Sequence, residues 1–207
     1  MNIGILGGSF DPIHNGHIHM AVSACQAFAL DEVWLIPAGH SPNKKEELMT
    51  DAADRLRMCE IAAGQDARLL ASSIEVDAPE VSYTYRTLEK LTARYPMHRF
   101  FFIMGGDSLD YFDRWVNPGR ICALATILVI PRDQFDTAAL EAKITRIEKS
   151  FPCDIRIVPC SQYPLSSTEV RRALSEGREE PSDFPPGVLA YIRKKHLYPL
   201  QHKEQST

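Results

Sequence analysis

Residues 7–17 read GGSFDPIHNGH, and this stretch decides the expected fold. It follows an apolar run at residues 3–6 and leads into residues 16–30, where apolar residues recur at helical spacing. The expected order is therefore a strand, a glycine turn and a helix. Such a turn exposes backbone N–H groups, and the start of a helix carries a partial positive charge. The junction therefore suits an anion such as phosphate.

Two histidines open the predicted helix. His14 and His17 are three positions apart, so both imidazoles can face the same oxygens. A structural turn with surface histidines is one alternative, and a zinc site that also uses His19 is another. The zinc interpretation has little support, because the sequence contains neither Cys-x-x-Cys nor His-Glu-x-x-His. The dinucleotide fingerprint and the phosphate-loop Gly-Lys-Ser/Thr signature are also absent from the turn.

Length and composition narrow the class of protein. The 207 residues favour a single domain over residues 1–200, followed by a polar tail at 201–207. The net charge of −4 argues against a general nucleic-acid binder. Five widely spaced cysteines suggest reduced core thiols. We expect a cytoplasmic protein without a membrane span, because no secretory signal is visible and the longest apolar run, 121–130, favours a buried strand. No exposed apolar stripe marks an interface between copies, so the sequence defines no oligomeric state.

Apolar runs alternate with helical patterns along the chain, which is typical of a parallel α/β sheet. Further strands are expected at residues 32–37, 68–71, 99–104, 126–130 and 155–158. Further helices are expected at residues 51–64, capped by Thr50, and at 82–95, 136–149, 168–175 and 185–196. Ligands of open parallel sheets bind beyond the carboxyl ends of the strands. The segments 7–17, 38–49, 105–107 and 131–132 should therefore gather at one edge of the sheet.

Two further motifs follow strands. Gly105 and Asp107 follow the strand at 99–104, where glycine allows close approach of a base or sugar and a carboxylate accepts from ribose hydroxyls. Asp107 as an ordinary helix N-cap is the alternative. Ser166, Thr168 and Arg171 open a later helix, where hydroxyls, free N–H groups and a guanidinium suit the outer phosphates of a triphosphate. A plain capped helix is again the alternative, because Glu169 lies three positions after Ser166.

The first motif resembles the signature of the nucleotidyltransferase superfamily with the (H/T)xGH motif. Ser82-Tyr83-Thr84, Gly-Gly-Asp-Ser-Leu followed by Trp115, Leu-Ser-Ser-Thr-x-x-Arg and a closing Leu197-Tyr198 follow it in order. Together they resemble the bacterial nicotinate-nucleotide adenylyltransferase family from about residue 2 to residue 200. One departure is visible in the second loop, where the family often has histidine and this chain has Asn43. Lys44 or Lys45 is then the candidate for the cationic role.

The resemblance implies a Rossmann-like, doubly wound and mainly parallel α/β sheet with a small helical C-terminal part. It implies ATP and nicotinate mononucleotide as substrates, with Mg²⁺ carried on ATP and no metal site of the protein's own. The residues implied for catalysis are His14, His17, Lys44 and Arg171. Those implied for ATP binding are Gly7, Gly8, Ser9, Phe10, Gly16, Gly105, Asp107, Ser166 and Thr168. Those implied for the mononucleotide are Tyr83, Thr84, Trp115 and Arg132, with a core role for Trp115 and an ordinary exposed position for Arg132 as alternatives.

The implied reaction is attack of the mononucleotide phosphate on the α-phosphorus of ATP. The attacking group is already an anion, so no serine or cysteine nucleophile is needed, and the protein aligns the groups and stabilises charge. Three other functions stay open. They are a phosphopantetheine adenylyltransferase, an enzyme that accepts nicotinamide as well as nicotinate mononucleotide, and a nucleotide-binding regulator without catalysis.

Overall fold

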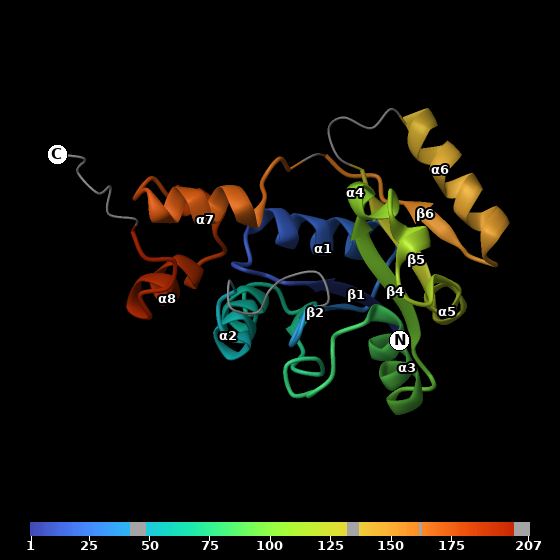
Figure 1. Ribbon diagram of the computed structural model, residues 1–207, viewed down its shortest axis with the longest axis horizontal. Coiled ribbons are helices and arrows are strands. Elements are labelled where there is room, and N and C mark those ends of the chain that lie inside the picture. Colours follow the sequence, from blue (N-terminus) through green and yellow to red (C-terminus); the bar gives the residue numbers. More distant parts are fainter. Residues whose placement is uncertain (42–48, 132–136, 162, 201–207) are drawn as a thin grey trace.

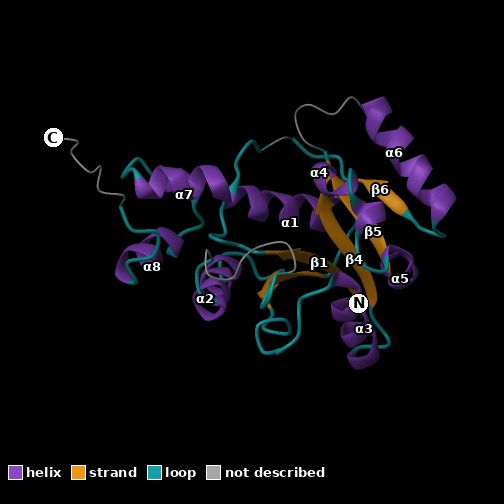
Figure 2. Cartoon of the chain, viewed as in Figure 1, coloured by secondary structure: helices purple, strands orange, loops and turns teal. Residues whose placement is uncertain are grey.

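The computed structural model describes residues 1–41, 49–131, 137–161 and 163–200. A parallel sheet lies at the centre with helices around it (Figures 1 and 2). The strands are β1 (Asn2–Gly8), β2 (Glu32–Pro37), β3 (Leu69–Ala71), β4 (Arg99–Gly105), β5 (Ala125–Ile130) and β6 (Ile155–Ile157). The α-helices are α1 (Asn15–Ala27), α2 (Ala52–Ala63), α3 (Thr84–Arg94), α4 (Gly106–Leu109), α5 (Pro118–Leu124), α6 (Thr137–Ser150), α7 (Ser167–Ser175) and α8 (Val188–Lys194).

The strand order is β3-β2-β1-β4-β5-β6. The chain therefore builds outward from β1 in one direction and then crosses to β4 to build in the other. This reversal is the topological switch point of a doubly wound sheet, beside which such folds bind ligands. The predicted α/β class is confirmed, and the turn at residues 7–17 lies directly at the reversal.

Both faces of the sheet are covered, so alternate residues of one strand enter two separate cores. Phe101 and Ile103 of β4 pack in the core that also holds residues of α1, α2, α7 and α8. Phe100 and Phe102 pack in the core shared with α3, α5 and α6. This explains why the strands read as nearly continuous apolar runs, as strands buried on both faces do. Figure 1 shows α7 and α8 at the opposite end of the molecule from α6.

The structure corrects three expectations about local structure. The apolar run at 121–130 is not one strand: its first four residues end α5, and only Ala125–Ile130 is strand. Asp51 rather than Thr50 caps α2, because its carboxylate accepts the N–H of Ala53 at 2.8 Å. The short helices α4 and α5 were not predicted. Their spans of four and seven residues are too short to show a helical period.

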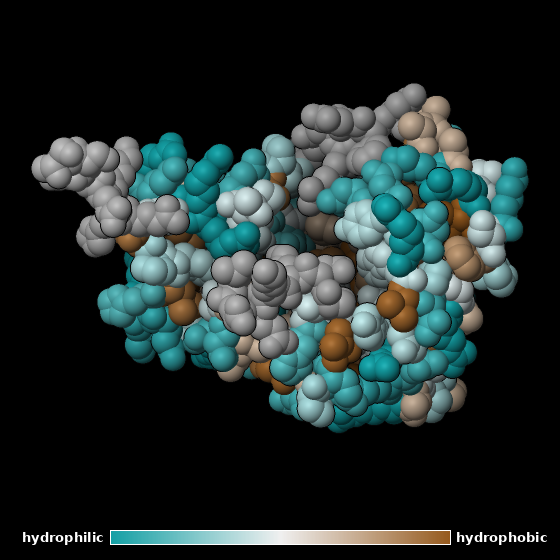
Figure 3. Space-filling view, viewed as in Figure 1, coloured by the Kyte–Doolittle hydropathy of each residue, from teal (hydrophilic) through white to brown (hydrophobic). Residues whose placement is uncertain are grey.

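The described surface carries few large apolar groups. Figure 3 shows a mainly hydrophilic face with scattered apolar residues. Within the described residues, no helix is long and apolar enough to cross a membrane. The five cysteines are free thiols, and Cys25, Cys59 and Cys122 are buried.

Candidate functional site

The strand registers bring the ends of the central strands to one edge. Gly8 of β1 pairs with Pro37 of β2 and, two residues earlier, Leu6 pairs with Ile103 of β4. Gly105 in turn lies opposite Ile130 of β5. The segments that follow these strands therefore begin side by side, as predicted from their positions after strands.

The two histidines lie against each other at the start of α1. His14 is the N-cap residue and is 3% exposed. Its ring centroid is 3.8 Å from that of His17, with the planes tilted by 32°. The backbone N–H of His14 donates to Nδ1 of His17 at 3.2 Å. An Nδ1 that accepts leaves Nε2 to carry the proton of a neutral imidazole, so His17 presents an N–H donor at its far side.

Close packing supports this pair. Phe10 has a positive φ of 46°, is 1% exposed and contacts the His17 ring edge-on, with centroids 4.9 Å apart. The buried Phe10 ring therefore packs against His17 and is not available to stack on a nucleotide. A Cβ at Gly16 would lie 3.0 Å from the His14 ring and 3.4 Å from the carbonyl oxygen of Leu165. Glycine at position 16 thus lets the His14 ring and the backbone at Leu165 approach α1 closely.

Helix α7 docks onto the turn from a distant part of the sequence. Arg171 donates from Nη1 to the carbonyl oxygen of Asp11 at 2.6 Å. The Ser167 hydroxyl donates to the carbonyl oxygen of Pro12 at 3.1 Å. The fold therefore brings the guanidinium, the start of α7 and the histidine pair to one place, although they were predicted from separate motifs.

The two predicted hydroxyl ligands of α7 already have partners. Ser166 is the N-cap, and its hydroxyl donates to Oε2 of Glu169 at 2.6 Å while accepting the Glu169 N–H at 3.3 Å. Thr168 is exposed, and its hydroxyl oxygen accepts from Nη2 of Arg171 at 3.3 Å. The capped-helix alternative accounts for the Ser166 contacts, and Thr168 is placed as a support for Arg171.

Sequence reasoning missed the residue that links these parts. Asp11 is 2% exposed, and its Oδ1 accepts a hydrogen bond of 2.6 Å from the hydroxyl of Tyr198. Burial raises the pKa of Tyr198 well above its ordinary value, and the neighbouring Asp11 carboxylate adds to the rise. The phenol is therefore a permanent donor at physiological pH. Both residues stood inside quoted motifs, but nothing in the sequence indicated that they meet.

A buried arginine fixes the other side of the turn. Arg55 of α2 is 2% exposed. It donates to the carbonyl oxygens of Ser9 at 2.7 Å, Ala38 at 2.6 Å and Thr50 at 2.9 Å. Burial lowers its pKa, which the nearby Asp11 carboxylate partly offsets. A signal was present: Arg55, Met58, Cys59 and Ala62 follow helical spacing, so the arginine shares the apolar face of α2.

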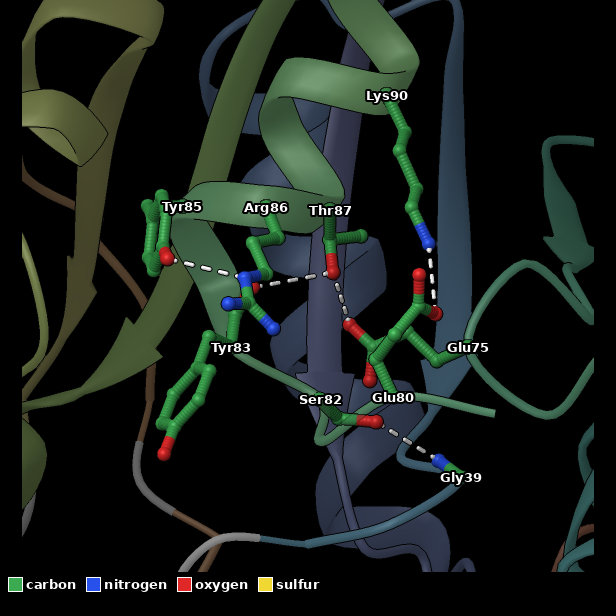
Figure 4. A network of polar contacts seen from close by, with 9 residues as sticks. All are labelled: Gly39, Glu75, Glu80, Ser82, Tyr83, Tyr85, Arg86, Thr87 and Lys90. Carbon is green, nitrogen blue, oxygen red and sulfur yellow. Dashed lines mark hydrogen bonds and ion pairs between the residues drawn. The ribbon is translucent and has the colours of Figure 1, made fainter. Parts of the chain in front are cut away.

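The predicted mononucleotide segment forms a polar network around Glu75 (Figure 4). The Thr87 hydroxyl donates to Oε1 of Glu75 at 2.6 Å, and the Ser82 hydroxyl accepts from the Gly39 N–H at 3.0 Å. Burial raises the pKa of the Glu75 carboxyl. Tyr83, at the N-cap of α3, stacks on Tyr85 at 6.2 Å, and the Arg86 guanidinium lies 5.5 Å from the Tyr83 ring.

The small pocket beside this network does not hold a nucleotide as the side chains stand. Glu75, Ser82, Tyr83 and Thr87 are among its lining residues, and its cavity volume is about 10 Å³. That is roughly the space one water molecule needs. Thr84 begins α3 at the edge of this region.

Asp107 and Trp115 lie in the segment that follows β4 in the chain. The Trp115 ring packs edge-on against Phe102 at 6.0 Å and also against Phe112 at 5.5 Å. It is half-buried and joins the same core as α3, which agrees with the core alternative for its ring. Asp107 lies in the first turn of α4, whose N-cap is Gly105, so Asp107 is not the N-cap that the alternative supposed.

Two predicted site residues, Lys44 and Arg132, lie outside the described residues, as do Asn43 and Lys45. His19, from the zinc alternative, is described, and its Nε2 lies 2.5 Å from the carbonyl oxygen of Ser161. Within the described part of the chain, no group of three or more His, Cys, Asp or Glu side chains is arranged to hold a metal ion.

Comparison with known proteins defines the class and then the family. Residues 5–173 match the family described as "Cytidylyltransferase-like". The chain therefore belongs to this class of nucleotidyltransferase-fold proteins. It is 35% identical over 196 residues to the "Probable nicotinate-nucleotide adenylyltransferase" of Geobacillus thermodenitrificans, covering 95% of this chain and 85% of the relative. It is 34% identical over 199 residues to the protein of that name from Clostridium botulinum (strain Okra), covering 96% and 99%. Within the class, the chain belongs to the nicotinate-nucleotide adenylyltransferase family.

Solved structures agree with this fold. Plasmodium falciparum nicotinic acid mononucleotide adenylyltransferase complexed with APC matches with a TM-score of 0.75 and 21% identity, over 97% of this chain and 98% of that chain. The same enzyme complexed with NaAD matches with a TM-score of 0.77 over the same shares. The expected Rossmann-like architecture is confirmed.

Proposed function

We propose that this chain transfers the adenylyl group of ATP to nicotinate mononucleotide, giving deamido-NAD and pyrophosphate. Membership of the family supports the reaction. One structural observation supports its location: Arg171 contacts the backbone of the turn that carries the His14–His17 pair. Donors from opposite ends of the sequence therefore converge at the switch point of the sheet, where a triphosphate is expected to bind.

The chemistry needs alignment and charge stabilisation. The mononucleotide phosphate attacks the α-phosphorus, the new P–O bond forms, and the bond to the bridging oxygen breaks with pyrophosphate as the leaving group. His17 donates from Nε2 to oxygen at the α-phosphate, where negative charge gathers in the transition state. His14 and the N–H groups of Gly8 and Ser9 line the same turn. Arg171 and the start of α7 hold the outer phosphates.

The remaining site assignments complete this proposal. Gly7, Gly105 and Asp107 border the adenosine, while Tyr83, Thr84 and Trp115 border the pyridine nucleotide. On sequence grounds alone, Lys44 is proposed as a phosphate contact and Arg132 as an anion contact of the mononucleotide. We place residues 1–200 in one catalytic domain and the enzyme in the cytoplasm; both remain predictions.

Magnesium fits this arrangement as a partner of ATP. Hydroxyl, imidazole and guanidinium groups surround the turn, and such groups suit phosphate oxygens better than a hard cation that prefers carboxylate and water oxygens. The two carboxylates nearby are engaged within the protein: Asp11 is buried and bonded to Tyr198, and Glu169 caps α7 through Ser166. When bound, Mg²⁺ neutralises charge on the phosphates. The residues named above hold the phosphates themselves, and none of them is assigned as a metal ligand.

Pyrophosphate release tests the proposal. The purified chain is mixed with Mg·ATP and with nicotinate mononucleotide, nicotinamide mononucleotide or phosphopantetheine in parallel, with ATP alone as the control. We expect release with nicotinate mononucleotide and formation of deamido-NAD. Equal rates with both pyridine nucleotides would indicate an enzyme that accepts both mononucleotides. Release only with phosphopantetheine would indicate a phosphopantetheine adenylyltransferase. ATP binding with no release in any mixture would indicate a regulator.

A further inference from the structure

Tyr198 joins the last described segment of the chain to the first turn. It lies 187 positions from Asp11, yet its hydroxyl donates to the Asp11 carboxylate at 2.6 Å. Because Asp11 is 2% exposed, water does not replace this donor easily. A buried carboxylate that loses a hydrogen bond is costly, so it would turn toward other donors or draw water inward.

Any such movement reaches the proposed catalytic groups through the backbone. The carbonyl oxygen of Asp11 is the acceptor for Arg171 at 2.6 Å, and Asp11 precedes the N-cap residue His14 by three positions. The next carbonyl, that of Pro12, accepts from Ser167 at 3.1 Å. The side chain of Asp11 is thus held by Tyr198 while its backbone holds α7. The Tyr198 hydroxyl is engaged by the Asp11 carboxylate, so we assign it to positioning and not to substrate.

We propose that Tyr198 is a positioning residue for adenylyl transfer, acting through Asp11 on the turn that carries His14 and on the acceptor of Arg171. This inference rests on the proposed function, because it concerns the geometry of that site. It assigns to the C-terminal segment a role in the chemistry in addition to its packing.

The chain offers a matched control in Tyr191. This tyrosine of α8 donates to Oδ1 of Asp54 on α2 at 2.7 Å, so it makes the same kind of bond at nearly the same length. Both bonds are partly buried and both tie the C-terminal region to the rest of the fold. Only the partner of Tyr198 lies in the turn. Asp54 is more exposed than Asp11 and also lies 3.8 Å from Lys195, so the loss of stability should be larger in Tyr198→Phe. A purely structural role predicts near-normal kcat/KM in both variants at temperatures where both are folded.

The experiment compares these two variants with the wild-type chain in three measurements. They are the thermal midpoint, steady-state kinetics with Mg·ATP and nicotinate mononucleotide, and the ring ¹H–¹³C resonances of His14 and His17 without substrate. We expect a larger fall in the midpoint for Tyr198→Phe than for Tyr191→Phe, because the carboxylate left without its donor is more buried. We expect kcat/KM for ATP to fall by about 10- to 100-fold in Tyr198→Phe, the scale of a small misplacement of reacting groups, and by less than about twofold in Tyr191→Phe. The histidine resonances should move only in Tyr198→Phe.

A second background covers the case in which Tyr198→Phe does not fold. Asp11→Asn keeps the shape and an accepting oxygen but removes the buried charge, so the loss of the phenol should cost less there. Adding Tyr198→Phe to Asp11→Asn should then change kcat/KM for ATP by less than about threefold relative to Asp11→Asn alone, a comparison that does not need the single tyrosine variant. Equal kinetics and unmoved histidine resonances in the two tyrosine variants would overturn the positioning role. Wild-type inactivity would instead overturn the proposed function, while the resonances would still test the coupling.

Discussion

The backbone N–H of His14 donates to Nδ1 of His17 at 3.2 Å, and the centroids of the two imidazole rings lie 3.8 Å apart. One histidine therefore sets the orientation of the other through the first turn of α1. The pair acts as a unit because a shift of either ring changes the direction in which Nε2 of His17 presents its proton.

His17→Ala is expected to lower kcat by at least ~10²-fold, the scale for losing one preorganised group that stabilises charge in the transition state. The fold should persist, because the ring packs at the start of a helix and not in either core. His19→Ala is the control, since its ring contacts the Ser161 carbonyl and not the pair. Pyrophosphate release and far-UV circular dichroism measure the two effects. A kcat within twofold of wild type would remove His17 from the reaction.

Arg171→Ala is expected chiefly to raise KM for ATP, by roughly 10- to 100-fold if one charge-assisted phosphate contact is lost. Arg172→Ala is the matched control, because Arg172 is the next residue of α7 and is exposed. Titration of ATP at saturating nicotinate mononucleotide separates KM from kcat. Unchanged values of both in Arg171→Ala would exclude a phosphate contact by this residue.

Arg55→Met is expected to lower the free energy of unfolding by about 3 kcal/mol, because several buried carbonyl oxygens lose a charged donor at once. Arg57→Met on the same helix should change the free energy of unfolding by less than about 0.5 kcal/mol, since Arg57 is exposed and forms a surface ion pair with Glu60. Urea unfolding followed by circular dichroism provides the comparison. Similar losses in the two variants would show that the buried contacts contribute little.

Glu75→Gln tests the pH dependence of stability. Burial raises the pKa of Glu75 in the folded chain above its ordinary value of 4.5, so folding favours the protonated form. The wild-type chain therefore loses stability as the pH rises from that value through the raised pKa, and the glutamine variant does not. The free energy of unfolding of the variant minus that of wild type should grow as the pH rises above 4.5 and become level only above the raised pKa.

The control for this prediction is Glu80→Gln in the same segment. Glu80 is exposed, pairs with Lys90 at 3.3 Å, and its pKa is lowered by a backbone hydrogen bond and by that lysine. The stabilisation from ionised Glu80 is complete by pH 5. The free energy of unfolding of Glu80→Gln minus that of wild type should therefore stay level up to pH 8. A difference for Glu75→Gln that does not grow with pH would contradict the raised pKa.

Local patterns were sufficient to predict the architecture. The strand at 32–37 has the predicted bounds, and the other strands lie within two residues of theirs, because the apolar runs are nearly continuous where both faces are buried. Three features could be identified from the sequence because each stands in a motif whose residues are close together: the histidine pair, the glycines and Arg171. Local spacing also explains the errors: α5 was merged with β5 because its apolar residues adjoin those of the strand.

The supports of the site could not be predicted, because they depend on partners that only the fold brings together. Nothing near Tyr198 indicates Asp11, and nothing near Arg55 indicates the carbonyl of Ser9. Ser166 shows the opposite case, in which a local capping box uses the hydroxyl that was assigned to phosphate. Sequence thus indicates candidate ligand-binding groups more easily than the residues that hold those groups in place.

The bond between Tyr198 and Asp11 has a consequence for synthesis of the protein. Translation adds the donor of this bond 187 residues after the turn that contains its acceptor. A nascent chain that already contains the whole sheet still lacks this donor, and α7 arrives only shortly before it. A chain that stops between α8 and Tyr198 would keep the helices of both cores and still leave the buried Asp11 carboxylate without its phenol, so we expect such a product to be folded but poorly active.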